Sequence, residues 1–282
     1  MILTRRAFLG GALSLAAVGT AGARGADRAQ LKQHSAALPG LRRSLRVAQL
    51  TDLHYGLYIS APSVRAWVDL TLAARPDLIL VTGDFLDADV AKDAGPLLAE
   101  LSRLRAPLGV WGVWGNHDYG SFGKYARLGH SPQRDNWQER RAAFGNDLAA
   151  AGLTILNNVG VQVRDDLYLA GVDDFMQGEP DLERALAGAG QGATLLMSHN
   201  PDLLPQVPES VGLTVCGHTH GGQVRLPLLG AVSTASRYGQ RFAQGWVEGP
   251  ARGFVSRGLG MTAVPLRLNC PAEVVVFVLR PA

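Results

Sequence analysis

The sequence contains little cysteine and no large excess of charge of either sign. Only two of its 282 residues are cysteines, Cys216 and Cys270, too few for a disulfide framework and without the paired spacing of a structural zinc site. We therefore expect two buried thiols. The formal net charge is +3, and it falls to about +1 if an N-terminal segment containing Arg5 and Arg6 is removed. A nearly neutral protein has no electrostatic basis for binding nucleic acid, so we expect no nucleic-acid partner.

Low-complexity segments and fixed-period repeats are also absent, which excludes a fibrous or repetitive chain. The composition, 47% hydrophobic and 18% charged, is typical of a soluble globular protein. The length suits one large domain, because α/β and sandwich folds commonly reach ~250 residues as a single unit.

The first 23 residues have the pattern of an export signal. Arg5 and Arg6 precede an uncharged stretch, rich in Gly and Ala, that ends in small residues and is too weakly apolar to span a membrane well. The arginine pair resembles a twin-arginine (Tat) signal, although Gly10 stands where a lysine is usual. We predict a cleaved signal peptide at residues 1–23 and a linker at residues 24–43. Export by the Tat machinery to the periplasm or cell envelope would follow; a retained anchor or an N-terminal amphipathic helix is the alternative.

Apolar segments of strand length alternate with helical patterns in the first half of the chain. Three such segments, residues 44–53, 77–82 and 108–114, lead into polar residues. Helical patterns at residues 63–75 and 94–105 separate them. This strand–helix–strand order predicts parallel strands with helical crossovers, whose carboxyl ends meet in one crevice.

The second half has shorter, closely spaced strands joined mostly by turns. We predict strands at residues 153–157, 159–164, 167–172, 194–197, 213–216, 253–256 and 273–279. Because few long helices separate them, we expect a second, mixed sheet. The predicted fold class is α/β, a four-layer αββα sandwich of two mixed β-sheets flanked by helices, formed by residues 44–282.

Five of the seven histidines lie in short polar clusters that directly follow strand-like segments. With one further carboxylate, the clusters are Asp52-x-His54, Gly83-Asp84, Gly115-Asn116-His117-Asp118, Ser198-His199-Asn200 and Gly217-His218-Thr219-His220. Side chains two residues apart on a strand share a face, so Asp-x-His and His-x-His can each reach one ion. A single histidine at a strand end is usually a surface or core-edge residue, whereas five such histidines with Asp and Asn indicate a metal site. These ligand types suit Mn, Fe or Zn, and the lack of thiolates argues against structural zinc.

In this order the five motifs resemble those of the calcineurin-like metallophosphoesterase superfamily, over roughly residues 45–280. The resemblance implies a β-sandwich flanked by helices and two divalent metal ions per chain, with Mn favoured. Matched motif by motif, it implies one metal bound by Asp52, His54 and His220, a second bound by Asn116, His199 and His218, and Asp84 as the bridge. It also implies a catalytic role for two residues that are not ligands: His117 would face the leaving group. Asp118 would orient the loop or His117, or would simply cap a turn.

Two cations ~3.5–4 Å apart can hold a phosphate and lower the pKa of a bridging water, so that a metal-bridging hydroxide attacks phosphorus. We therefore expect a binuclear-metal-dependent phosphoesterase that hydrolyses phosphodiester or pyrophosphate bonds. The alternatives are a phosphomonoesterase with the same site and a non-catalytic scaffold of the same fold. The expected partner is a phosphate-ester substrate, nucleotide-linked or lipid-linked, and peripheral contact with a membrane is a further option.

Differences from two other branches of this superfamily narrow the choice of branch that the chain resembles. Asp87 stands three residues after Asp84, where purple acid phosphatases have a metal-binding tyrosine, and the Asp-Arg-Gly of protein Ser/Thr phosphatases is missing. Residues 198–202, 217–223 and 256–260 instead resemble an exported or membrane-peripheral bacterial branch.

The segment after the catalytic loop, residues 119–140, combines aromatic and basic side chains. As a lid it would stack on a base or hold an acyl chain and attract phosphate, and the alternative is a surface loop that leads into a helix. Residues 221–227 and 237–241 are weaker candidates for the opposite rim of the site.

Overall fold

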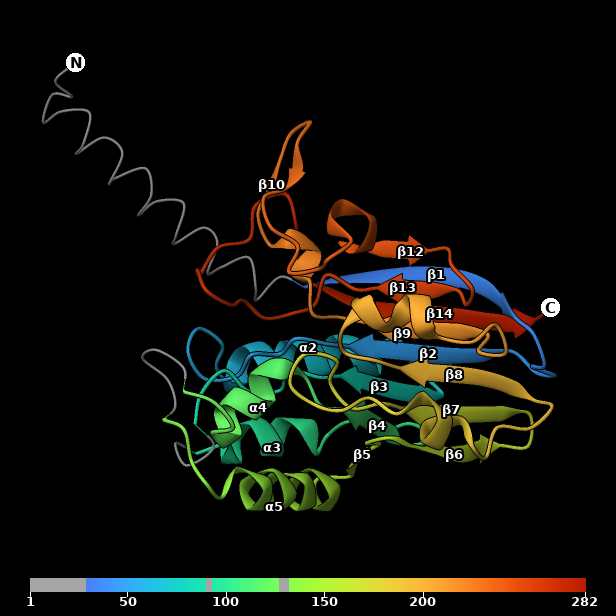
Figure 1. The fold of residues 1–282 in the computed structure, drawn as a ribbon, viewed down its shortest axis with the longest axis horizontal. Coiled ribbons are helices and arrows are strands. Elements are labelled where there is room, and N and C mark those ends of the chain that lie inside the picture. The colour runs from blue at the N-terminus through green and yellow to red at the C-terminus, as the bar shows by residue number, and fades with distance from the viewer. Residues whose placement is uncertain (1–28, 90–92, 127–131) are drawn as a thin grey trace, which may run out of the picture.

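Figure 1 shows the computed structural model, which describes residues 29–89, 93–126 and 132–282. The predicted signal peptide at residues 1–23 lies outside the described residues. Two six-stranded sheets form the body of the protein, and helices pack on their outer faces. The predicted α/β fold class, with two mixed sheets flanked by helices, is confirmed.

The first sheet has the strand order β1-β14-β2-β3-β4-β5. The strands are, in that order, Gln30–Leu38, Glu273–Pro281, Leu45–Leu50, Leu78–Thr82, Val110–Val113 and Leu153–Ile155. β2 to β5 run parallel to one another, whereas β14 is antiparallel to β2 and parallel to β1. The helices that follow its strands are α2 (Ala61–Ala73), α3 (Gly95–Leu101), α4 (Asn116–Phe122) and α5 (Trp137–Ala150).

The second sheet has the order β12-β13-β9-β8-β7-β6. Its strands are, in that order, Gly245–Val247, Gly253–Val255, Leu213–Cys216, Ala193–Met197, Leu167–Gly171 and Val159–Arg164. The four inner strands are parallel, and both edge strands are antiparallel to their neighbours. Its short helices are α6 (Leu182–Leu186) and the 3-10 turns η2 (Pro201–Gln206), η3 (His220–Gly222) and η4 (Gly239–Phe242), and a separate hairpin joins β10 (Arg225–Leu226) to β11 (Gly230–Ala231).

The buried strands explain the layers, because successive side chains point to opposite faces of a sheet. In β2, Leu45 and Val47 pack into the core between the sheets, while Ala48 and Leu50 pack under α2 to α5. Strands buried on both faces have nearly continuous apolar sequences. Cys216 and Cys270 are both buried free thiols, as predicted. Each helix in the described ranges is too short or too polar to cross a membrane.

The structure corrects the expected linker at residues 24–43. Residues 30–38 form β1, an edge strand in register with β14, and Leu38 packs into the core between the sheets. The strand is half polar because one side of it faces solvent, and its partner lies at the other end of the sequence. The prediction that residues 153–157 and 273–279 belong to the second sheet is also wrong, because β5 and β14 lie in the first sheet. Pairing between distant segments leaves no local pattern in the sequence.

Candidate metal centre

The seven predicted ligands converge at the carboxyl ends of strands from both sheets. Each follows the end of a strand: β2, β3 and β4 in the first sheet, and β8 and β9 in the second. All seven side chains are at most 8% exposed: Asp52, His54, Asp84, Asn116, His199, His218 and His220. The loops that follow the parallel strands lie at the same edge, and they bring together residues up to 168 positions apart in the sequence.

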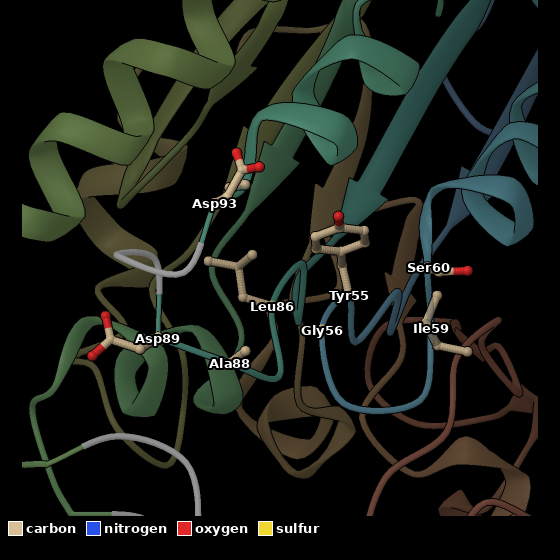
Figure 2. Close-up of a pocket in the computed structure, with 9 residues that line it drawn as sticks. Tyr55, Gly56, Ile59, Ser60, Leu86, Ala88, Asp89 and Asp93 are labelled. Atoms are coloured by element: carbon tan, nitrogen blue, oxygen red, sulfur yellow. The ribbon is translucent and has the colours of Figure 1, made fainter.

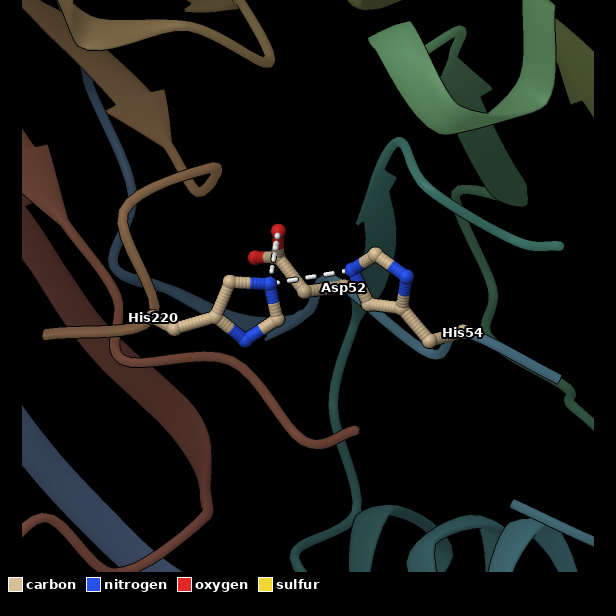
Figure 3. Close-up of side chains that lie close together, drawn as sticks. All are labelled: Asp52, His54 and His220. Carbon is tan, nitrogen blue, oxygen red and sulfur yellow. Dashed lines mark hydrogen bonds and ion pairs between the residues drawn. The ribbon is translucent and has the colours of Figure 1, made fainter. Parts of the chain in front are cut away.

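The first group of donors is Asp52, His54 and His220 (Figure 3). The Nε2 atoms of His54 and His220 face each other at 2.9 Å. His220 Nε2 also lies 3.5 Å from Asp52 Oδ1. Two imidazole nitrogens and a carboxylate thus point at one position, which suits a divalent cation of the Mn, Fe or Zn type.

The second group is Asn116, His199 and His218. His199 Nε2 lies 3.2 Å from Asn116 Oδ1 and 3.3 Å from His218 Nδ1. Asp84 lies between the groups, because its Oδ2 is 3.4 Å from His54 Nε2 and 3.3 Å from His199 Nε2. This is the position that a bridging carboxylate requires.

Buried charges at this centre favour a cation. Although burial opposes protonation, the carboxylates of Asp84 and Asp52 raise the pKa of His199 to about 10. Although burial opposes ionisation, the rings of His199 and His117 hold the pKa of Asp84 well below its usual range. Burial and the neighbouring His199 lower the pKa of His218 to about 3, so that its ring is neutral, as a ligand must be. The donor set therefore fits divalent metal ions.

The backbone around the ligands adopts an unusual conformation. Five of the seven ligands have left-handed φ angles between 48° and 72°: Asp52, His54, Asp84, His218 and His220. Residues with side chains rarely adopt this region, and such strain concentrates at functional sites. Backbone amides orient the carboxylates: His218 N donates to Asp52 Oδ1 at 3.0 Å, and His117 N donates to Asp84 Oδ1 at 2.8 Å.

Two glycines allow this close approach of the backbone. A Cβ on Gly115 would lie 2.2 Å from Asp84 Oδ1, and a Cβ on Gly217 would lie 2.5 Å from Asp52 Oδ2. Real Cβ atoms do not approach other atoms this closely, so any other residue would displace the carboxylate. The glycines of the predicted motifs therefore have a steric role.

His117 lies beside the ligand groups, with its side chain 19% exposed. Its Nδ1 is 2.8 Å from Asp87 Oδ1, and the ring centroid is 4.6 Å from that of His54. Asp87 is 1% exposed and also lies 3.8 Å from His54 Nδ1. Although burial opposes ionisation, the His117 and His54 rings lower the pKa of Asp87.

Asp87 is the residue whose contribution the sequence interpretation missed. The only local signal was a third acid three residues after Asp84, which the comparison with other branches treated as a missing tyrosine. An aspartate that accepts a hydrogen bond from an imidazole fixes the ring orientation and stabilises its protonated form.

Asp118 accepts backbone hydrogen bonds with both of its carboxylate oxygens. Its two carboxylate oxygens accept hydrogen bonds from the backbone amides of Leu86 and Gly115, each at 3.0 Å. The second bond completes the capping box at the start of α4. Asp118 thus holds together the two loops that carry Asp87 and His117, which is the loop-orienting role considered from the sequence.

A cavity of about 430 Å³ opens beside the ligands. Asn116, His117, His218 and His220 line its inner part, and apolar residues, including Met176, Val224, Val232 and Val264, form much of the rest. Gly222 and Gln223 also line it, so part of the predicted rim at residues 221–227 borders the cavity.

The structure does not support residues 119–140 as a substrate-binding lid. Tyr119 and Phe122 are fully buried in the core under the first sheet, and Arg134 forms an ion pair with Asp89 at 2.8 Å. In the part of this segment that the structure describes, no residue lines the cavity beside the ligands. Among the described residues of this segment, Tyr119 and Phe122 pack in the core, and Arg134 and Arg140 pair with Asp89.

A second cavity of about 280 Å³ flanks the loops that carry His54 and Asp87. Figure 2 shows Tyr55, Leu86 and Ala88 around it, and none of the predicted site residues lines it. Its wall is tied to the site through the backbone, because the amide of Asp87 donates to the carbonyl of Tyr55 at 2.9 Å.

The chain is similar in sequence to known metallophosphoesterases. The sequence pattern of the Calcineurin-like phosphoesterase family matches residues 45–222. The chain is 30% identical to the metallophosphoesterase YkuE of Bacillus subtilis, over 99% of this chain and 98% of that protein. It is 29% identical to the phosphodiesterase YaeI of Escherichia coli, over 82% and 81%. A 5'-nucleotidase precursor structure from Thermus thermophilus is 14% identical, with a TM-score of 0.45, over 83% of this chain and 55% of that chain.

Proposed function

The chain belongs to the calcineurin-like phosphoesterase family, a family of metal-dependent phosphoester hydrolases, and on this basis we propose that it is a two-metal phosphodiesterase of the cell envelope. One observation carries the proposal. A single carboxylate oxygen, Asp84 Oδ2, lies within 3.4 Å of His54 Nε2 and 3.3 Å of His199 Nε2, so that two donor groups share one bridging position.

Two divalent cations in this site would supply a nucleophile at neutral pH and neutralise the charge that develops on phosphorus. The chain's own residues then orient the substrate and move protons. Because His117 Nδ1 faces Asp87 at 2.8 Å, proton transfer to the leaving oxygen would proceed from Nε2. The Asp87 carboxylate favours the protonated ring, which is the form that an acid requires.

Diester hydrolysis is favoured over monoester hydrolysis by the charge of the cavity. None of the cavity-lining residues that the structure describes is a lysine or an arginine. A monoester dianion carries more charge than a diester monoanion and gains more from such side chains. The relative YaeI is named a phosphodiesterase, which agrees with this choice. A phosphomonoesterase with the same residues is the alternative.

Export and metal identity complete the proposal. The arginine pair at Arg5 and Arg6 supports Tat-dependent export to the periplasm or envelope, with removal of residues 1–23. The mixture of imidazole, carboxylate and amide donors supports Mn, Fe or Zn, and we favour Mn. The proposed substrate is a nucleotide-linked or lipid-linked phosphoester.

Metal content and substrate preference together test the proposed function. The purified chain, loaded separately with Mn, Fe or Zn, should bind close to two ions by elemental analysis, and Asp84→Ala should lose both metal and activity. The loaded protein should hydrolyse a bis-aryl phosphodiester at least about tenfold faster than the aryl monoester, as kcat/KM. A stoichiometry that never exceeds one contradicts the two-metal site. Faster monoester turnover supports the alternative, and full metal content without turnover supports a scaffold.

A further inference from the structure

The hairpin of β10 and β11 projects away from the two sheets (Figure 1). Its tip is apolar and open to solvent: Leu228 is fully exposed and Leu229 is 75% exposed. Isolated exposed leucines are ordinary on protein surfaces, whereas adjacent ones at the end of a projecting hairpin indicate a contact surface.

Leu228 occupies a left-handed position in the three-residue turn between β10 and β11. Its φ angle is 67°, in the left-handed region that glycine or asparagine occupies with little strain. A bulky aliphatic residue in that position is strained, and its side chain makes no compensating buried contact because it is fully exposed. The turn sets this backbone conformation, and the exposed leucine side chain contributes no packing within the folded chain.

The apolar surface continues from the hairpin to the cavity at the metal centre. Val232, directly after the hairpin, is 67% exposed, and Val264 is 47% exposed. Both line the cavity that contains His117 and His220. Any partner that covers the hairpin tip would therefore lie at the entrance of the site.

Two exposed arginines, Arg237 and Arg241, lie beside this surface. Residues 210–272 contain six arginines and a single acidic residue, Glu248. Of these arginines, Arg267 is buried and Arg257 forms an ion pair with Glu273, whereas Arg237 and Arg241 remain exposed. The side chain of Arg237 is 79% exposed, 4.0 Å from an Asp202 oxygen, and Arg241 is also exposed. Their segment packs on the hairpin, because the Gln240 side chain donates to the carbonyl of Ala231 at 2.6 Å.

An apolar tip flanked by arginines matches the surface of an anionic bilayer. A second copy of the chain would instead bring two arginine-rich faces together. We propose that the hairpin, residues 225–231, docks the protein on an anionic lipid membrane, with Arg237 and Arg241 against the headgroups. The cavity then faces the lipid surface, which selects lipid-linked phosphoesters as the substrate class; this second step rests on the proposed function.

A fluorophore at the hairpin tip tests docking without turnover. Because both native cysteines are buried, Leu228→Cys in the full chain can be labelled selectively with an environment-sensitive dye. The matched control is Val159→Cys, which is 44% exposed on β6, at the opposite edge of the second sheet from β12. With vesicles that contain phosphatidylglycerol, emission should shift to the blue at position 228 only.

The charge component is tested on the same labelled protein. Arg237→Gln with Arg241→Gln should weaken the vesicle affinity about fivefold for each charge removed, and phosphatidylcholine vesicles should bind much less. No shift at position 228, or equal binding to both kinds of vesicle, overturns the proposal. A shift that appears without vesicles as the protein concentration rises identifies a second copy as the occupant and also overturns it.

The substrate class is tested with Leu228→Ser combined with Leu229→Ser. This variant should bind anionic vesicles about 10- to 100-fold more weakly than wild type, while Val159→Ser should bind normally. It should hydrolyse a water-soluble diester at the wild-type rate and a vesicle-embedded lipid phosphodiester more slowly. Unchanged vesicle binding overturns docking. An equal loss on both substrates overturns the lipid substrate class, and inactivity of the metal-loaded wild type on every ester indicates that the proposed function has failed while docking stands.

Discussion

The Asp87–His117 pair allows a quantitative test of how the site moves a proton. Asp87 is 1% exposed and its Oδ1 lies 2.8 Å from His117 Nδ1. Asp87→Asn keeps the shape of the side chain but removes the charge that orients and protonates the ring. A hydrogen bond to a buried charged group contributes about 1.5–3 kcal/mol, which corresponds to about 10- to 150-fold in rate. We expect kcat to fall within that range.

A double-mutant cycle separates this effect from others. His117→Ala should lower kcat by ~10²–10⁴, the usual contribution of a positioned acid or base. If Asp87 acts through His117, then Asp87→Asn should change little once His117 is absent, so that the double variant matches His117→Ala. Both losses should shrink for esters with good leaving groups, because these need little protonation.

The assay is kcat across aryl phosphodiesters of varied leaving-group pKa, with metal content measured in each preparation. Asp87 also lies 3.8 Å from His54 Nδ1, so it could act through a metal ligand instead. A further loss of activity or metal when Asp87→Asn is added to His117→Ala would refute the dyad. Metal loss in His117→Ala alone would show that His117 is a ligand. If the ratio of wild-type kcat to His117→Ala kcat is the same for all leaving groups, His117 stabilises charge without donating a proton.

Three further predictions concern the metal site and export. Gly115→Ala should reduce metal content and activity, measured by elemental analysis and turnover, because its Cβ would lie 2.2 Å from Asp84 Oδ1; a fully loaded, active variant would contradict the steric argument. Because the pKa of His199 is raised to about 10, metal loading at pH 8 should release a proton into weakly buffered solution, and metal affinity should rise with pH up to about 10; uptake without proton release would contradict this. Arg5→Lys with Arg6→Lys should trap the precursor inside the cell, and unchanged export on fractionation would exclude a Tat signal.

The sequence was sufficient to predict that the seven candidate ligands would converge, but not the hydrogen bonds that surround them. Each motif follows an apolar strand, and parallel strands end at one edge, so the convergence of Asp52, Asp84 and His218 could be predicted. The hydrogen bond of Asp87 to His117 could not, because it joins two loops separated by 30 residues and depends on how α4 begins.

Sheet membership was the other limit. The β1 segment is half polar and has no strong strand pattern, and only pairing with β14, more than 240 positions away, makes it a strand. Likewise β5 resembles the short strands that follow it, yet it pairs with β4 in the first sheet. The aromatic residues of α4 suggested a lid because local sequence does not distinguish a side chain over a cavity from one buried in the core.

Five of the candidate ligands have a left-handed backbone conformation, and the two sheets must stabilise it. Each such residue costs about 1–2 kcal/mol, so five of them consume an amount comparable to the net stability of a domain, about 5–15 kcal/mol. The conformation persists because a buried strand precedes each of these residues and neighbouring loops hydrogen-bond to one another. The amide of Asp52 donates to Gly83 at 3.0 Å, and that of His54 donates to Asp84 at 2.9 Å, so the β2 and β3 loops hold each other. The donors come from the ends of strands in both sheets, β2, β3 and β4 in the first and β8 and β9 in the second. Donors from both sheets can then reach positions that neither sheet could surround alone.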